Sequence, residues 1–256
     1  VNEYGVGYIK MDYNIEPGIG TDLDADSYGD GLLGHNRAYL EWLDGIFERY
    51  PDLIIENCSS GGLRMDYAML SRYSIQSTSD QEDYVRYATI TANAPSAVTL
   101  EQAAVWSYPL TDGDCEEVVF NMVNALLLRI HQSGHLVNLS PERFGYVKEA
   151  ISYYKTIRHL TKKALPYWPL GLSSYSDPWV SLGLEAEGKD FLAVWRRNSQ
   201  MPVQEIPVKH LKGKAVKAVC AYPESAECAY HWNKEAGTLT VELPSRVSAR
   251  IFELRY

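Results

Sequence analysis

The stretch LIIENCSSGG at residues 53–62 decides the fold class. Its first half is a short apolar run that ends in a Gly-rich loop, which is typical of a strand buried on both faces of a parallel sheet. Helical spacing over residues 36–50 precedes this run, and a helical stretch at 64–72 and a further strand at 74–78 follow it. Strands and helices therefore alternate, which predicts β/α units built around a parallel sheet.

The same alternation extends outward in both directions. Residues 8–13 (YIKMDY) predict a short strand that ends in polar side chains, and residues 95–100 predict another strand. Apolar patterning predicts helices over residues 82–92, 115–132 and 141–163.

The pattern changes after residue 164. Apolar residues then alternate with small or polar ones in short runs, which are separated by turn signals such as EGKD at 187–190 and KGK at 212–214. This predicts an antiparallel β-sandwich domain at 165–256, with strands near 180–184, 191–195, 216–220, 239–243 and 247–252.

Charge and composition exclude several classes of function. The 256 residues include 24 Lys and Arg against 33 Asp and Glu, a net charge of −9. Residues 1–164 carry 13 basic and 23 acidic side chains, whereas 165–256 carry 11 and 10. An acidic chain argues against a nucleic-acid partner, and the absence of an apolar run of about 18 residues argues against a membrane span.

The four cysteines, at positions 58, 115, 220 and 228, form no C-x-x-C pair. Their spacing favours reduced thiols in a cytoplasmic protein. The chain starts at Val1 without a signal-peptide pattern, and we interpret it as a fragment of a longer protein.

Polar side chains gather where the predicted parallel strands end, namely Lys10, Asp12, Glu56, Asn57, Cys58, Asp80, Glu101 and Gln102. Active sites of (β/α)₈ barrels form at this edge, and two carboxylates there suit acid/base or glycosidic chemistry. The alternative interpretation is structural, because strand-end aspartates often cap the following helix, as Asp80 would for a helix at Glu82.

Three motifs favour the catalytic interpretation over the structural one. Residues 8–14 (YIKMDYN), 58–66 (CSSGGLRMD) and Ser79-Asp80 resemble, in order, the nucleophile, C-x-x-G-G-x-R-x-D and S-D motifs of glycoside hydrolase family 36, the bacterial α-galactosidases (melibiases). Residues 130–134, 144–145 and 154–158 resemble further signatures of that family. The resemblance implies that residues 1–164 are the C-terminal half of a TIM (β/α)₈ catalytic barrel.

The resemblance also implies a role for each matching residue. Asp12 would be the nucleophile of a retaining double displacement, and Asp80 the general acid and then the base. Lys10 would hydrogen-bond sugar hydroxyls and help to keep Asp12 ionised, because it precedes Asp12 by two residues on the same strand face. Cys58 and Ser60 would lie near the sugar 2-hydroxyl.

Other polar and aromatic residues have a less definite interpretation. Arg64 is either structural or orients a carboxylate, and Trp106 either lines the mouth of the pocket or packs in the core. His131 and His135 have i, i+4 spacing but no third ligand, so we expect no metal. The resemblance implies no cofactor, because two carboxylates suffice for the reaction.

Three departures from the family pattern bear on the substrate. Ile15 replaces an arginine, Ser77 stands near the position of a tryptophan, and Gln81 follows the S-D motif. An N-acetylgalactosaminide or a galactosaminide therefore remains an alternative substrate, and a non-catalytic homologue remains an alternative function. A third alternative is sugar binding by the β domain through Trp179, Trp195 or Trp232.

The resemblance implies an α-galactoside oligosaccharide as substrate and a homo-oligomer as a common assembly. It also implies that the N-terminal part of the barrel is missing from these residues. We therefore expect the chain alone to be inactive without that part.

Overall fold

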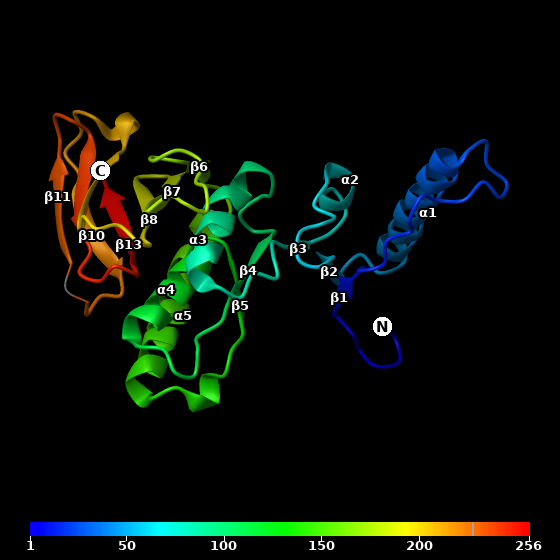
Figure 1. Ribbon diagram of the computed structural model, residues 1–256, viewed down its shortest axis with the longest axis horizontal. Coiled ribbons are helices and arrows are strands. Elements are labelled where there is room, and N and C mark those ends of the chain that lie inside the picture. The colour runs from blue at the N-terminus through cyan, green and yellow to red at the C-terminus, as the bar shows by residue number, and fades with distance from the viewer. Residues whose placement is uncertain (227) are drawn as a thin grey trace. The chain divides into compact units, whose positions relative to one another are not determined.

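The computed structural model describes residues 1–226 and 228–256, and the chain divides into two compact units, residues 1–80 and 81–256. Figure 1 labels the elements of both units. The predicted domain boundary after residue 164 lies inside the second unit and stays a prediction.

The first unit holds three parallel strands in the order β1-β2-β3, namely β1 (Tyr8–Asp12), β2 (Ile54–Cys58) and β3 (Ile75–Ser77). Helix α1 (Tyr28–Arg49) follows β1, and the short helix α2 (Tyr67–Leu70) follows β2. The register places Asp12 beside Cys58 and Asn57 beside Gln76. The alternation of parallel strands with helices is therefore as predicted.

The core of this unit lies between the sheet and α1. Leu43 of α1 and Ile55 of β2 are buried there, and Met11 packs against them. Because successive side chains of a strand point to opposite faces, Lys10 and Asp12 lie on the face of β1 that is turned away from this core. Helix packing on one face thus leaves the other face to polar residues.

The second unit begins with α3 (Tyr84–Asn93), η1 (Ala94–Ser96), β4 (Ala103–Ser107), α4 (Cys115–Leu126), β5 (Arg129–Gln132), η2 (Leu136–Asn138) and α5 (Pro141–Thr161). Strands β4 and β5 are parallel, and Trp106 lies beside His131 in their register.

Two of the predicted elements in this region are wrong. The strand predicted at 95–100 is a 3₁₀ turn followed by a bend, and the strand begins at Ala103 instead. Pro95 lies at the start of that turn and cannot donate a ladder hydrogen bond. The helix predicted over 115–132 ends at Leu126, because residues 129–132 form β5. Helix α4 is buried from residue 117 to 126, so the apolar pattern continues past its last residue and does not mark where the helix ends.

The remaining strands form two antiparallel sheets, of orders β10-β13-β8-β7-β6 and β11-β12-β9. They are β6 (Leu165–Tyr167), β7 (Trp179–Ala186), β8 (Lys189–Arg196), β9 (Val203–Pro207), β10 (Lys217–Tyr222), β11 (Ala229–Asn233), β12 (Thr238–Glu242) and β13 (Ser248–Arg255), with η3 (Lys209–Leu211) after β9. Leu192, Ile206, Val241 and Phe252 share one core, which joins the two sheets. The predicted antiparallel β-sandwich is confirmed, although β6, β9 and β11 were not predicted.

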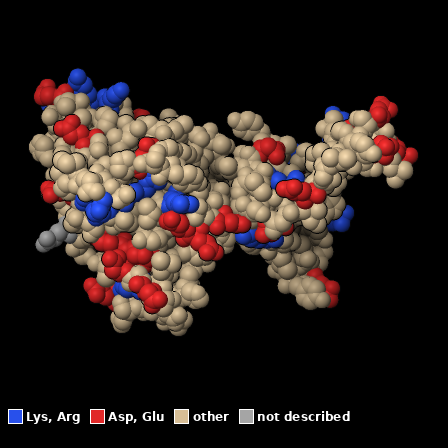
Figure 2. Space-filling model, in the orientation of Figure 1, with Lys and Arg blue, Asp and Glu red and all other residues tan. Residues whose placement is uncertain are grey.

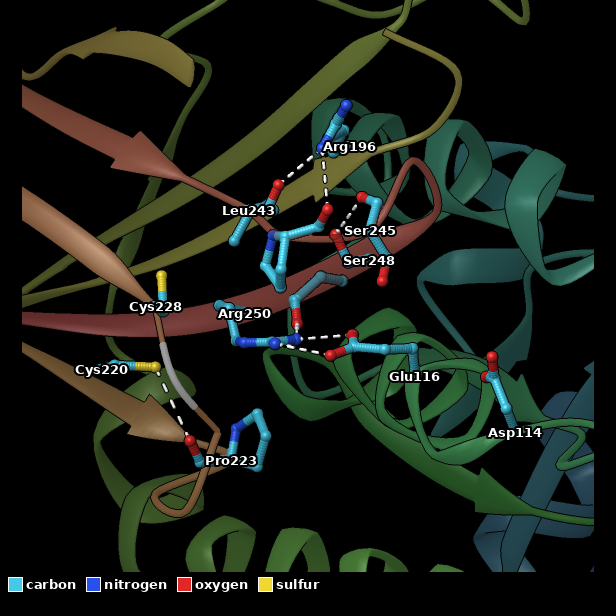
Figure 3. Close-up of polar contacts among 12 residues, drawn as sticks. Asp114, Glu116, Arg196, Cys220, Pro223, Cys228, Leu243, Ser245, Ser248 and Arg250 are labelled. Carbon is cyan, nitrogen blue, oxygen red and sulfur yellow. Dashed lines mark hydrogen bonds and ion pairs between the residues drawn. The ribbon is translucent and has the colours of Figure 1, made fainter. Parts of the chain in front are cut away.

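Helix α4 is tied to the β domain by a partly buried ion pair, which Figure 3 shows. The guanidinium of Arg250, on β13, donates to both carboxylate oxygens of Glu116 at 2.8 and 2.7 Å. Arg197 donates to the hydroxyl of Thr89, on α3, at 2.7 Å. These contacts tie α3 and α4 to the antiparallel sheets within residues 81–256, which form one compact unit.

The charged residues on the face drawn in Figure 2 are of both signs, and Asp and Glu lie among Lys and Arg. Within the part of the chain that the structure describes, none of the helices has the length and apolar character that crossing a membrane requires.

Candidate active site

Asp12 is the last residue of β1, and its neighbour on β2 is Cys58. Cys58 is fully buried, and the pKa of its thiol is influenced by the Asp12 carboxylate and by the hydroxyl of Ser77. Burial raises the pKa of the Cys58 thiol, and the nearby Asp12 carboxylate raises it further, against the backbone N–H of Gly61, the hydroxyl of Ser77 and the charge of Lys10. A protonated thiol therefore lies against the carboxylate that is predicted to be the nucleophile.

Lys10 and Glu56 are neighbours one step earlier on the same two strands. Glu56 is 1% exposed and accepts a hydrogen bond from the hydroxyl of Tyr8. Lys10, Asp12, Glu56 and Cys58 thus lie on one face of the sheet, since paired residues of parallel strands point to the same side. The face combines a cation, two carboxylates and a thiol, which suits the binding of sugar hydroxyls.

The loop at residues 58–62 is fixed to the segment that follows Asp12. The Tyr13 N–H donates to the Cys58 carbonyl at 2.8 Å, and the Ser59 hydroxyl donates to the Tyr13 carbonyl at 2.5 Å. The backbone N–H of Ser60 donates to Oδ1 of Asn14 at 2.7 Å. Asn14 is not among the predicted site residues, although it lies in the motif at 8–14, which is the signal that could have indicated it.

The same loop packs against the segment that carries Asp80. Gly61 has φ of +79°, and a Cβ there would lie 2.5 Å from Cα of Ser79 and 2.6 Å from the backbone N of Asp80. Such distances require glycine, because no side chain fits between the two backbones. One loop therefore holds the strand end that carries Asp12 and the segment that carries Asp80.

Asp80 is exposed and lies three residues beyond β3. The structural alternative for it is wrong, because α3 begins at Tyr84 and its cap is Asp83, whose carboxylate accepts from the N–H groups of Val85 and Arg86. Asp80 is thus not used to cap the helix that follows.

Arg64 braces the backbone after Asp12. Its guanidinium donates to the carbonyls of Tyr13 and Ile15 at 3.3 and 2.9 Å and lies 3.8 Å over the Tyr13 ring. These contacts set the path of the loop after β1. A role of Arg64 toward a carboxylate or a sugar stays a prediction.

A cavity of about 420 Å³ adjoins Asp12 and has aromatic walls. Tyr39 and Trp42, on α1, stack at 5.9 Å between ring centroids, and Tyr13 packs on Tyr39 at 5.2 Å. Trp42 is 49% exposed. Sequence reasoning missed this wall, although the i, i+3 spacing of Tyr39 and Trp42 places them on one face of a helix.

Trp106 belongs to the second unit, where its ring packs edge-to-face on His131 at 5.1 Å and lies 5.8 Å from Tyr108. Glu101 and Gln102 precede β4 and so do not lie at its carboxyl end, which corrects their predicted place. Among the described residues, no group of three His, Cys, Asp or Glu side chains could hold a metal ion.

Carboxylates at and beyond the carboxyl ends of parallel strands are the arrangement expected of a β/α site of the glycosidase class. The comparison with known families agrees. The Melibiase family model matches residues 1–162, and the chain belongs to that family.

Named relatives are α-galactosidases. The chain is 25% identical over 183 residues to Alpha-galactosidase Mel36A of Lactobacillus acidophilus, which is 68% of this chain and 25% of the relative. It is 32% identical over 110 residues to Alpha-galactosidase C of Emericella nidulans, which is 41% of this chain and 14% of the relative.

The fold also matches a solved structure, a variant of GH36 alpha-galactosidase AgaA from Geobacillus stearothermophilus in complex with raffinose. The TM-score is 0.73 at 18% identity, and the match covers 97% of this chain and 35% of that one. The partial barrel followed by a β domain is thereby confirmed as the fold class. The chain spans a third of the length of this structural relative, and a quarter or less of the two sequence relatives.

Proposed function

We propose that the full-length protein hydrolyses terminal α-galactosides with retention of configuration. The observation that carries this proposal is the loop at 58–62, which contacts the backbone beside both Asp12 and Asp80. In the first step, the Asp12 carboxylate attacks the anomeric carbon while Asp80 gives its proton to the departing glycosidic oxygen. In the second, Asp80 takes a proton from water, the water oxygen bonds to the anomeric carbon, and Asp12 leaves.

The neighbouring side chains support these two steps. We infer that the Lys10 ammonium, on the same strand face as Asp12, binds sugar hydroxyls. Cys58 and Ser60 would contact the 2-hydroxyl, Arg64 would hold the loop in place, and Trp106 would border the pocket. Complexes of relatives with raffinose and with stachyose support an oligosaccharide substrate.

The test is hydrolysis of an aryl α-galactoside by the full-length protein. Asp12→Asn should lower kcat by roughly 10⁴-fold or more, as expected for loss of a nucleophile. Asp52→Asn is the control, because Asp52 is an exposed turn residue outside the site and should retain activity.

Azide added to variants of the two carboxylates distinguishes the role of Asp12 from that of Asp80. Azide added to Asp12→Gly should attack the anomeric carbon itself and give a β-galactosyl azide. In Asp80→Gly, azide should displace Asp12 from the glycosyl intermediate and give the α-azide.

Proton NMR of the wild-type reaction should show α-galactose as the first product. If β-galactose forms first, the retaining mechanism is wrong.

The alternative substrates are tested in the same assay. Turnover of an aryl N-acetyl-α-galactosaminide or α-galactosaminide without turnover of the galactoside would favour the alternative suggested by Ile15, Ser77 and Gln81. No turnover of any of them would favour a non-catalytic homologue.

A further inference from the structure

Two of the four cysteines lie together in the β domain, within the second unit. Cys220 belongs to β10 and Cys228 stands directly before β11, and both are free thiols. Their side chains are half-buried and pack against the core that joins the two antiparallel sheets. Figure 3 shows both thiols beside the side chain of Arg250. Because β10 and β11 belong to different sheets, the pair lies where one sheet meets the other.

Contacts with backbone carbonyls fix the position of each thiol. Sγ of Cys220 lies 3.7 Å from the carbonyl oxygen of Pro223, and Sγ of Cys228 lies 3.4 Å from that of Glu242. Each thiol is also the largest influence on the pKa of the other, which requires the two sulfur atoms to be close neighbours. The two side chains therefore form a thiol pair.

The two thiols differ in their tendency to ionise. The pKa of the Cys228 thiol lies below its usual value, because the Cys220 thiol and then the Arg250 cation favour the thiolate. They outweigh burial and the carboxylates of Glu116 and Glu242, which raise that pKa. In the other direction, the Cys228 thiol and burial raise the pKa of Cys220. Cys228 is therefore the nucleophile of the pair, and Cys220 is its protonated partner.

The other two cysteines lie in surroundings that oppose ionisation. Burial raises the pKa of both Cys58 and Cys115, and the carboxylate of Glu142 raises that of Cys115 further. The structure describes all four cysteines, and Cys228 is the one whose surroundings favour the reactive thiolate.

Arg250 supplies a fixed positive charge beside the pair. It is 1% exposed, and its two terminal nitrogens donate to Glu116 and to the carbonyl of Ala249. Among the described residues, its Nε has no hydrogen-bond partner. A buried donor of this kind is available to stabilise negative charge that develops in a reaction at the neighbouring sulfur.

We propose that Cys228 and Cys220 form a site of reversible oxidation, with hydrogen peroxide as the oxidant. The Cys228 thiolate attacks one peroxide oxygen, the O–O bond breaks, and hydroxide leaves with both electrons of that bond, so that Cys228 becomes a sulfenic acid. The sulfur of Cys220 then bonds to that of Cys228, and its proton leaves with the sulfenic oxygen as water. The two sulfurs together lose two electrons, which the peroxide gains.

The product is a disulfide that closes the segment of residues 220–228 and links the two antiparallel sheets covalently. A cross-link of this kind restricts the unfolded chain and so stabilises the β domain. A dithiol reductant reverses the step by thiol–disulfide exchange. This inference does not depend on the proposed function.

The test is peptide mapping by mass spectrometry of the folded full-length protein after brief treatment with hydrogen peroxide near neutral pH. We expect a cross-link between Cys220 and Cys228, lighter by two hydrogen atoms than the reduced form and removed by dithiothreitol. Cys220→Ser should instead accumulate a sulfenic acid on Cys228, which dimedone labels. Cys115→Ser is the matched control, because Cys115 is also half-buried, and it should keep the cross-link.

A second measurement uses the wild type alone. Iodoacetamide should alkylate Cys228 about tenfold faster than Cys115, because the rate follows the fraction of thiolate. Equal rates, or dimedone labelling of Cys115 in place of Cys228, would overturn the assignment of the nucleophile. If the oxidised wild type shows no cross-link between Cys220 and Cys228, the inference is wrong whatever the variants show.

Discussion

Gly61→Ala tests whether the loop at 58–62 positions the site. A Cβ at Gly61 would lie 2.5 Å from Cα of Ser79 and 2.6 Å from the N of Asp80, and both obstacles are backbone atoms. They cannot rotate away as a flexible side chain could. The loop or the segment that carries Asp80 must therefore move.

The size of the effect follows from two contributions. Ordinary contact begins at 3.4 Å, so the two backbones must separate by about 0.9 Å. A displacement of about 1 Å in a catalytic group lowers the rate by about 10²-fold. The φ of +79° adds a separate loss in the free energy of unfolding of about 1–2 kcal/mol, because alanine disfavours that conformation.

Gly188→Ala is the matched control. Gly188 has φ of +75° in the turn between β7 and β8, and nothing lies within 4 Å of the Cβ position. The control should share the loss in stability but not the loss in rate. The measurements are urea denaturation and kcat for an aryl α-galactoside with the full-length protein.

Equal kcat values for Gly61→Ala and the wild type would refute this reasoning, because the clash would then be relieved without moving Asp80. A fall in kcat that also appears in Gly188→Ala would refute it as well. That result would attribute the loss to backbone conformation in general.

Two further predictions concern buried charges. Arg143→Met leaves the Glu117 carboxylate buried without its cation, and should lower the free energy of unfolding by about 3–5 kcal/mol in urea denaturation; a loss below about 1 kcal/mol would contradict the importance of the pair. Burial opposes ionisation of Glu253, but Arg255 and Lys189 outweigh this effect and lower the pKa of its carboxyl group. The contribution of Glu253 to stability is therefore present above the ordinary glutamate pKa and is lost as pH falls through the lowered value. Glu253→Gln should therefore cost about 1–3 kcal/mol at pH 7 and progressively less below about pH 4.5, and a cost that is constant with pH would contradict the ion pairs as its source.

The alternation of strands and helices could be predicted from residues 53–62 because each element there is short and bounded by a turn. The same reasoning failed at 95–100, where Val98 and Leu100 are buried in a turn rather than in a strand. Burial and β-branching indicate a strand only when backbone partners are within reach, and those partners depend on tertiary structure.

The site could be predicted in part. The residues of the three motifs were identified from the sequence, and the register places Asp12 beside Cys58. What the sequence could not reveal is how each position is held. Gly61 is needed because a segment almost twenty residues later packs on its backbone, and the segment at Leu110 depends on Arg143. Such contacts have no periodic signal.

The bidentate pair of Glu116 and Arg250 has a consequence for synthesis, because 134 residues separate its members. At about 5–20 residues per second, the ribosome adds Arg250 roughly 7–27 seconds after Glu116. During that interval the surface of α4 that packs on β13 is uncovered. The nascent chain is therefore most dependent on chaperones between the emergence of α4 and that of the last strand.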